Sequence, residues 1–261
     1  MPSPNSLLTL VINLDRSPHR LDPIAVQLQK FDWAWERLPA ADGKNLSLQD
    51  MQLIDTRSFH RKHGMEPLSS ELGCYLSHVW AMRRFLETDK AFLLILEDDI
   101  QLGPDISDVI RGLMKQNQSW DVVMLSGVHR PMPLKVASVM PAYSLAIPLI
   151  KYAGSSCYLL HRAAAHTYLK DLLPMSLPYD HEYDRAWARG LKVRIVHPAP
   201  CQHSSEMGSD IAPQGAVQRK FHWSRRLPTY AWRIQNDLNR ILYGLGQWWK
   251  YRTYTRNPPS P

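Results

Sequence analysis

The chain has 261 residues, of which 44% are hydrophobic and 21% charged, a balance that excludes a disordered protein. No stretch approaches the ~20 apolar residues of a membrane-spanning helix. Three cysteines without a CxxC pair indicate neither a disulfide framework nor a zinc ribbon, so we expect a reducing cytosol. The net charge of +7 is concentrated in residues 219–256, which hold nine Lys or Arg and one acid, and this asymmetry predicts a separate C-terminal region.

Predicted strands and helices alternate along the rest of the chain. The apolar run at residues 7–14 is expected to be a first strand rather than a signal peptide, because no basic segment precedes it. In chain order the expected elements are a strand (7–14), a helix (17–31), a strand with alternating aromatics (31–38), a helix (70–87), a strand (91–100), a helix (105–116), a strand (120–127), a strand that continues into a helix (154–173), a short helix (180–190) and a strand (191–198). This alternation predicts an α/β fold with a mainly parallel sheet, in which ligands bind beyond the carboxyl ends of the strands.

The stretch FLLILEDDI, residues 92–100, runs a buried strand into three acids. Adjacent carboxylates repel one another and are costly to bury, so they need a positive partner. One interpretation is a solvated loop in which one acid caps the next helix. The other is a Mg²⁺ or Mn²⁺ site, because hard oxygen ligands suit these ions. Alternate residues of an extended chain face the same way, so Glu97 and Asp99 would converge on the metal while Asp98 points elsewhere.

Two further groups of polar residues lie near predicted strand and helix ends. Asn13, Arg16 and Arg20 follow the first strand. If the chain is helical from position 17, the two arginines share a face from which they could bind phosphates, and the alternative is a pair of surface arginines. His78 lies one heptad after Glu71 on the predicted helix, and a lone helical histidine is more often structural than catalytic.

Six short motifs occur in one order between residues 8 and 211: INLDRSPHR, AADG, SSELGCYLSH, LLILEDDI, GSSCYLLHRAAA and PYDHEYDRAW. Together they resemble glycosyltransferase family 25, the lipooligosaccharide galactosyltransferases of Gram-negative bacteria and the related collagen-modifying domains. The resemblance implies a GT-A-like fold, a nucleotide-sugar donor such as a UDP-sugar, Mn²⁺ (or Mg²⁺) as cofactor, and inversion at the anomeric carbon.

The resemblance also implies roles for particular residues. Glu97 and Asp99 match the metal motif, and His203 is a further metal ligand that we expect from the late part of the chain. The residues implied to bind the donor are Asn13, Arg16, Arg20, Asp42, Gly43, Ser77, His78, Asp98, Gly154, Ser155, Ser156, Ser209 and Asp210.

Inversion requires a base that deprotonates the attacking hydroxyl of the acceptor. The candidates are Asp180, Glu182 and Asp184, and we favour Asp180, which matches the acid that follows the proline in the family's later loop. The alternative for each is a structural role, either binding sugar hydroxyls or capping a helix. The segment HEYDR does not complete a zinc-binding HExxH helix, because position 185 is Arg185.

We therefore expect residues 1–212 to form a catalytic domain and residues 213–261 a basic, aromatic, helical tail. Ile234, Leu238, Ile241, Leu245 and Trp248 follow roughly helical spacing in that tail, although Gly244 and Gly246 weaken the prediction. Its basic and aromatic composition suits an anionic membrane surface. The alternatives are a helix packed on the catalytic domain with solvated arginines and, with less support, a single-stranded nucleic-acid site.

The function expected from the sequence is metal-assisted, inverting transfer of a hexose, foremost galactose, from a UDP-sugar to a glycan or glycolipid acceptor such as a lipooligosaccharide core. The expected location is the cytoplasm, and peripheral contact with the inner membrane is compatible with it. Two other classes stay open: a non-catalytic sugar-nucleotide or glycan-binding module, and a metal-dependent phosphoesterase.

Overall fold

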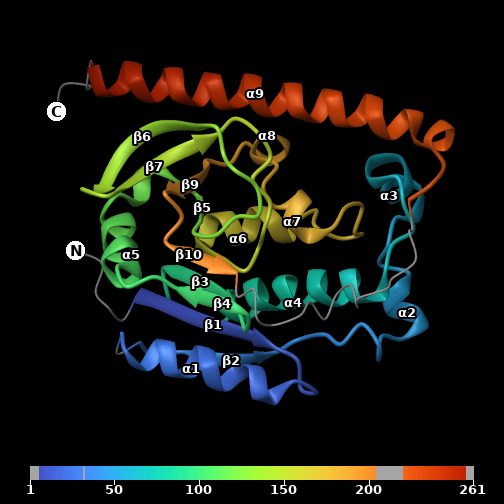
Figure 1. Ribbon diagram of the computed structural model, residues 1–261, viewed down its shortest axis with the longest axis horizontal. Coiled ribbons are helices and arrows are strands. Elements are labelled where there is room, and N and C mark those ends of the chain that lie inside the picture. The colour runs from blue at the N-terminus through green and yellow to red at the C-terminus, as the bar shows by residue number, and fades with distance from the viewer. Residues whose placement is uncertain (1–5, 32, 204–219, 257–261) are drawn as a thin grey trace.

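The computed structural model describes residues 6–31, 33–203 and 220–256. Its centre is an eight-stranded sheet in which six strands run in one direction, and only β7 and β8 run in the other. From one edge to the other, the strands are β2 (Glu36–Pro39), β1 (Leu7–Asn13), β3 (Phe92–Glu97), β8 (Cys157–His161), β5 (Val122–Met124), β9 (Val193–His197), β7 (Tyr143–Pro148) and β6 (Pro133–Met140). The expected α/β fold with a mainly parallel sheet is confirmed (Figure 1).

Helices connect most of these strands. They are α1 (Leu21–Gln29), α2 (Leu48–Met51), α3 (Thr56–His63), α4 (Ser69–Leu86), α5 (Ile106–Lys115), α6 (Arg162–Leu169), α7 (Tyr179–Glu182), α8 (Ala186–Arg189) and α9 (Leu227–Arg256), with the 3₁₀ turns η2 (Pro18–Arg20), η3 (Asn117–Ser119) and η4 (Trp223–Arg226). Two short strands, β4 (Ile100–Leu102) and β10 (Cys201–His203), form a separate antiparallel pair.

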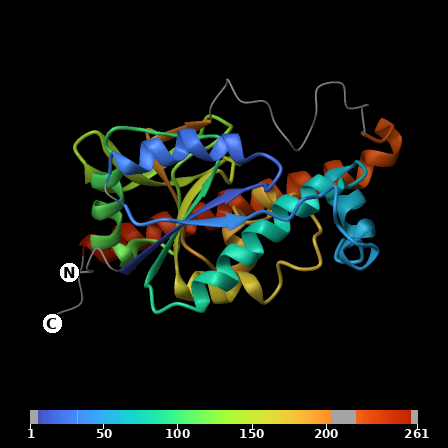
Figure 2. The ribbon, with the colours of Figure 1, turned by 90° about the horizontal axis from the view of Figure 1, so that it is seen from below.

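Both faces of the sheet are covered, which explains why its strands are apolar without interruption. Leu10 of β1 and Ile95 of β3 pack in a core with α4 and α6. The alternate residues Val11 and Leu94 pack in a second core with α1 and α5 on the other face. Figure 2 shows α1 and α4 on opposite sides of the sheet.

Strand pairing brings the acids and the first loop to one edge. Strands β1 and β3 are parallel neighbours with Ile12 opposite Glu97, so their carboxyl ends stop at the same level. The pairing of β10 with β4 places His203 opposite Ile100, which brings it close to the acids as well. This edge is where an α/β sheet binds its ligand.

Some elements differ from the sequence predictions. The second strand covers only Glu36–Pro39, and the aromatics Phe31, Trp33 and Trp35 lie before it, partly buried against the second core. The chain at residues 18–20 is a 3₁₀ turn and α1 begins at Leu21, so Arg16 lies before these elements and does not share a helical face with Arg20, as was expected if the chain were helical from position 17. The short helix predicted over 180–190 is two single turns, α7 and α8, and the hairpin of β6 and β7 was not predicted.

Helix α9 is a single helix of 30 residues along one side of the molecule, in red in Figure 1. Gly244 and Gly246 do not interrupt it. A Cβ at Gly244 would lie 2.9 Å from the Leu149 side chain, so this glycine lets the helix approach the end of β7. Within the described ranges, no helix combines the length and the apolarity needed to cross a membrane.

Candidate active site

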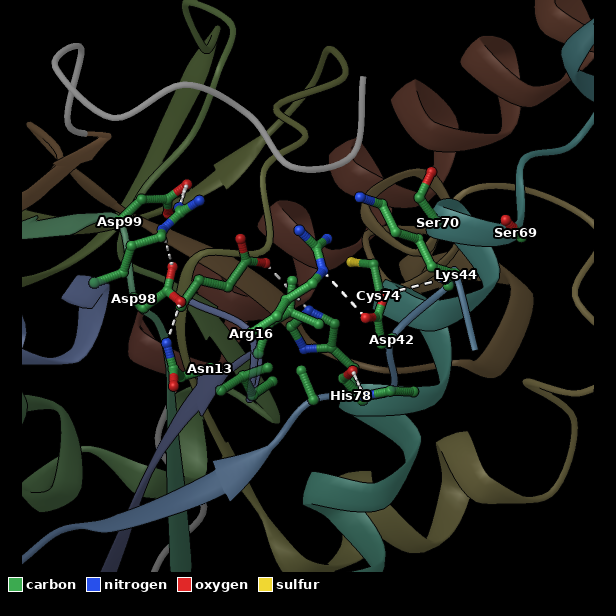
Figure 3. A pocket seen from close by; sticks show the side chains of 18 of the residues that line it. Asn13, Arg16, Asp42, Lys44, Ser69, Ser70, Cys74, His78, Asp98 and Asp99 are labelled. Atoms are coloured by element: carbon green, nitrogen blue, oxygen red, sulfur yellow. Dashed lines mark hydrogen bonds and ion pairs between the residues drawn. The ribbon is translucent and has the colours of Figure 1, made fainter. Parts of the chain in front are cut away.

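A cavity of about 450 Å³ opens at the carboxyl ends of β1 and β3. Its wall comes from four segments: the end of β1 with the turn that follows, the loop at residues 40–44, the first turns of α4, and the acids at residues 97–99. Figure 3 shows Asp98 and Asp99 on one side of this space, and Asp42 with Lys44 on the other. Segments that are distant in sequence therefore meet at the predicted ligand position.

Arg20 is the positive partner of the acid cluster. Its guanidinium lies between two carboxylates, with Nε 2.9 Å from Asp98 Oδ1 and Nη2 3.1 Å from Asp99 Oδ2. The arginine is buried, so the two ion pairs are little screened by water. Arg20, which was predicted to bind the donor, lines the cavity and balances the charge of two acids.

Asn13 holds the turn after β1 against the acids. Its side-chain amide donates to Asp98 Oδ2 at 2.7 Å and to the Ser17 carbonyl at 3.0 Å, and its Oδ1 accepts from Arg37 Nε at 2.9 Å. The residue is almost fully buried. These contacts indicate that Asn13 positions Asp98 at the edge of the cavity.

The loop at residues 40–44 lies directly against α4. Ser77 Oγ accepts from the Ala41 amide at 2.9 Å and donates to the Gly73 carbonyl at 2.8 Å, so its hydroxyl ties the loop to the helix. Asp42 accepts from Arg16 Nε at 3.1 Å and from the Lys44 amide at 3.0 Å. The DG and SH motifs therefore form one wall of the cavity.

Replacing Gly43 with alanine is expected to push this wall out of place. A Cβ there would lie 2.5 Å from Ser70 Cα and 2.6 Å from the Ser69 carbonyl, which are backbone atoms that cannot rotate away. For UDP, the ligand that the sequence resemblance implies, we expect Gly43→Ala to weaken binding at least ~10-fold, the equivalent of ~1.4 kcal/mol, as measured by calorimetric titration. Gly246→Ala is the matched control: it meets nothing within 4 Å and should stabilise α9 by up to ~1 kcal/mol. Unchanged UDP affinity in Gly43→Ala would contradict the close approach of Gly43 to the backbone of Ser69 and Ser70.

Lys44 and the N-terminus of α4 lie across the cavity from the acids, and neither was predicted from the sequence. Lys44 lines the cavity, as do Ser69 and Ser70 in the first turn of α4. The N-terminus of a helix carries free amide groups and a partial positive charge, which together favour a phosphate. The lysine directly after the DG motif and the SS pair that begins α4 are the signals that could have revealed these residues.

Glu97 is held by three side chains. His78 Nε2 lies 3.2 Å from Oε1, Ser155 Oγ donates to Oε1 at 3.0 Å, and Ser156 Oγ donates to Oε2 at 3.0 Å. Burial alone would raise its pKa, but these hydrogen bonds hold the pKa of Glu97 below its usual range. Glu97 therefore stays ionised at the edge of the cavity.

His78 extends this network into the core. The ring is stacked on Tyr179 at 4.1 Å, and its Nδ1 lies 3.0 Å from the Tyr158 hydroxyl. An ionised carboxylate only accepts, so Nε2 donates to Glu97. His78, which was predicted to bind the donor, lines the cavity, and these contacts make it a support for Glu97.

The segment at Gly154–Ser156 connects Glu97 to the later loop. Gly154 has a φ of +88°, and a Cβ there would lie 3.3 Å from the Gly127 Cα, so the position favours glycine. The backbone of Gly154 hydrogen-bonds to the carboxylate of Asp180. One segment thus contacts both a predicted metal ligand and the predicted base.

Asp180 lies in a buried polar cluster. Burial raises the pKa of its carboxyl, and Lys151 opposes that rise. Lys151 is hydrogen-bonded to His181, and burial together with the lysine charge lowers the pKa of His181 to about 3. The His181 ring is therefore neutral at ordinary pH. A half-buried carboxylate with a raised pKa suits proton transfer.

The other two candidate bases are engaged elsewhere. Glu182 is buried between Arg185 at 3.0 Å and Arg189 at 2.9 Å. Asp184 is fully buried and accepts two hydrogen bonds from Arg240 of α9, at 3.0 and 3.1 Å. None of the three candidate acids lines the cavity at the ends of β1 and β3, so the buried ion pairs are what distinguish Glu182 and Asp184 from Asp180. We therefore reassign Glu182 and Asp184 from candidate bases to ion pairs that stabilise the fold.

The predicted metal ligands are brought to the same region, although not as one compact group. His203 Nδ1 lies 3.2 Å from Ser156 Oγ, and the charge of His203 acts on Asp99. Across the described part of the chain, the three side chains that bring ligand atoms within 4.8 Å of one another are instead Cys74, His78 and Glu97. Burial, followed by the charge of Glu97, raises the pKa of the Cys74 thiol well above its usual value.

Asp99 carries the local feature that fits a cation. Its Oδ1 is buried without a hydrogen-bond partner among the described residues, which is costly for an ionised carboxylate. Burial and the charge of Glu97 raise the pKa of Asp99 to about 6, against the opposing effect of Arg20. A divalent ion would supply the missing partner. The predicted donor residues Ser209 and Asp210 lie outside the described residues.

Comparison with known proteins identifies the family of this chain. The sequence profile of glycosyltransferase family 25 (LPS biosynthesis protein) matches residues 7–182. A glycosyltransferase 25 family member of Drosophila pseudoobscura pseudoobscura is 32% identical over 98 residues, which are 36% of this chain and 16% of the relative. Procollagen galactosyltransferase 1 of Danio rerio is 24% identical over 178 residues, which are 65% of this chain and 30% of that protein. The chain thus matches only a minor part of each relative.

A solved structure with a similar outline is a glycosyltransferase involved in the glycosylation of the major capsid of PBCV-1. It has a TM-score of 0.43 and 8% identity, and the alignment covers 90% of this chain and 98% of that one. The profile match extends over about two thirds of the sequence and includes five of the six motifs in full, together with the start of the sixth. The chain belongs to glycosyltransferase family 25.

Proposed function

We propose that this protein is a metal-assisted, inverting glycosyltransferase that moves a hexose, foremost galactose, from a UDP-sugar to a saccharide acceptor such as a lipooligosaccharide core. The observation that carries the proposal is the cavity at the ends of β1 and β3, which is lined by acids, by Arg16 and Lys44, and by the N-terminus of α4. One of its acids, Asp99, has a buried oxygen with no hydrogen-bond partner among the described residues. Family membership supports glycosyl transfer as the reaction class. The name of the zebrafish relative motivates galactose as the sugar.

The donor diphosphate is assigned to the positive side of the cavity. Arg16 and Lys44 line that side together with the first turn of α4, and arginine binds phosphate oxygens in pairs. Asp98, fixed by Asn13 and Arg20, faces the nucleotide sugar. The sugar itself is assigned to the Gly154–Ser156 segment, between Glu97 and Asp180.

Glu97 and Asp99, with His203 as a further ligand, are the residues that would hold Mn²⁺ or Mg²⁺. Asp99 Oδ1 has no hydrogen-bond partner among the residues that the structure describes, which supports this assignment. When bound, such an ion neutralises charge that develops on the departing diphosphate. Arg20 holds Asp98 Oδ1 and Asp99 Oδ2 in place and offsets the repulsion between the two carboxylates.

Asp180 is assigned as the base. In a single displacement the acceptor hydroxyl forms a bond to the anomeric carbon, the bond from that carbon to UDP breaks, and the hydroxyl proton passes to the Asp180 carboxylate. The raised pKa of Asp180 makes it a better proton acceptor than an ordinary aspartate. Residues 1–212 carry this chemistry in our proposal, in the cytoplasm, and residues 213–261 form the tail.

Replacing Asp99 with asparagine tests the donor and metal assignments together. The variant keeps the shape of the side chain but removes its charge, so we expect UDP binding in the presence of Mn²⁺ to weaken at least ~10-fold, the equivalent of ~1.4 kcal/mol. Asp22→Asn, an exposed acid on α1, is the matched control and should bind UDP as the wild type does. If the wild type binds UDP equally well with and without Mn²⁺, and Asp99→Asn does not differ from it, the metal assignment fails.

A further inference from the structure

Helix α9 exposes a continuous apolar stripe. Its members are separated by three or four positions, so they lie on one side of the helix, and they are between 37% and 68% exposed. From first to last they span about 33 Å at ~1.5 Å per residue. We call these residues the α9 stripe: Leu227, Tyr230, Ile234, Leu238, Leu242, Leu245 and Trp249.

The opposite side of α9 faces the protein and makes several polar contacts with it. Arg240 forms the buried ion pair with Asp184, Arg233 Nη2 donates to the His63 carbonyl at 3.1 Å, and Arg185 Nε donates to Asn236 at 3.1 Å. A surface helix normally buries its apolar side and exposes its polar side. Here arginines attach the helix to the fold together with half-buried Trp232, Tyr243 and Trp248, and the leucines face outward.

Exposed apolar area of this extent marks an interaction surface. The positive charge identifies the partner. Arg233 and Arg240 face the protein, and residues 219–256 hold seven other basic residues against one acid, Asp237. Among them Arg225 lies just before the stripe, and Lys250 and Arg252 lie beside its end, all three exposed. Two copies of this chain packed stripe to stripe would bring these cations together, whereas a negatively charged surface would neutralise them.

An exposed tryptophan precedes the α9 stripe in the sequence, and another ends it. Trp223 in η4 and Trp249 near the end of α9 are 63% and 68% exposed. Large aromatic side chains prefer the boundary between the lipid headgroups and the acyl chains, and leucines between them reach the acyl chains. Figure 1 shows α9 along the outer side of the molecule, so the whole helix can lie flat on a surface.

We propose that the α9 stripe docks this protein on an anionic lipid bilayer, with α9 lying in the plane of the interface and its polar side still attached to the catalytic body. The inference rests on the exposed face of α9 and holds whether or not the chain transfers a sugar. If the proposed function is correct, membrane docking would hold the enzyme on a surface that carries lipid-linked acceptors.

The test is flotation with vesicles of phosphatidylcholine that contain ~30% phosphatidylglycerol or none. The wild type should float with the anionic vesicles, and 0.5 M NaCl should weaken this because salt screens exposed charges. The double variant Leu238→Gln and Leu242→Gln should lose binding at least tenfold, and glutamine retains good helix propensity. The matched control Val26→Gln with Leu48→Gln replaces two side chains that are 54% and 88% exposed on other helices, and should bind as the wild type does.

Three results would overturn the proposal. They are failure of the wild type to float with anionic vesicles, equal flotation of the Leu238/Leu242 variant and the wild type, and a wild-type dimer in sedimentation that this variant abolishes. Circular dichroism and thermal melting verify that both double variants are folded. UDP binding by the Leu238/Leu242 variant should be unchanged, so loss of vesicle binding is separate from any failure of the transferase assignment.

Discussion

The Asp180→Asn variant is expected to transfer sugar ~10²–10⁴-fold more slowly than the wild type while it binds UDP with nearly unchanged affinity. Asparagine has the shape of aspartate but cannot accept the proton of the acceptor hydroxyl. Asp180 does not line the cavity that we assign to the nucleotide, so donor binding should be spared. The measurement is a comparison of turnover rate with UDP affinity in the same protein preparation.

The pH dependence of the transfer rate is a second test of Asp180. Burial raises the pKa of Asp180, so its carboxyl takes up a proton at higher pH than an ordinary aspartate does. Because only the deprotonated form can act as base, the wild-type rate should fall as the pH is lowered through this raised pKa. The residual activity of Asp180→Asn should lack that decline. Asp171→Asn, an exposed acid in the preceding segment, is the control. A variant that retains more than about a tenth of the wild-type rate would place the base elsewhere.

The Arg240→Ala variant is expected to lower the free energy of unfolding by ~3–5 kcal/mol. The side chain of Asp184 has no exposed surface and depends on Arg240 for two hydrogen bonds. Without the arginine, a buried carboxylate is left unpaired, and this costs more than the ion pair itself contributes. Urea denaturation with matched m-values is the measurement.

A double variant separates the effect of the unpaired charge on the free energy of unfolding from the effect of lost packing. Asp184→Leu combined with Arg240→Leu removes both charges and should recover much of the lost stability, because no unpaired group remains. Arg252→Ala on the exposed side of α9 should change the free energy of unfolding by less than ~0.5 kcal/mol. A loss below ~1 kcal/mol in Arg240→Ala would show that α9 does not depend on this contact.

The sequence predicted much of the fold because apolar strands and periodic helices are local patterns. Strands β1 and β3 and helix α4 were found close to their observed ends, and parallel pairing then placed Asn13 beside the acids. The hairpin of β6 and β7 was missed because prolines lie at its ends. Pro133 is tolerated there because β6 is at the edge of the sheet.

The partners of the charged residues were not predictable from spacing. Arg20 is 79 positions from Asp99, and Arg240 is 56 positions from Asp184. No local pattern identifies such pairs. Arg20 was therefore predicted to be a phosphate ligand, and its role between two acids was not seen. For α9, helical spacing predicted the helix but not which of its sides faces the protein, since arginines can be either solvated or buried with acids.

Release of UDP from a UDP-sugar tests the central assignment most directly. The wild type is incubated with UDP-galactose, UDP-glucose or a UDP-N-acetylhexosamine, with and without Mn²⁺, and with and without a lipooligosaccharide core saccharide. We predict that UDP appears with one donor, foremost UDP-galactose, and that its release depends on both Mn²⁺ and the acceptor. No release from any donor would indicate a binding module, and free phosphate without acceptor would indicate a phosphoesterase. Either result would contradict the glycosyltransferase assignment.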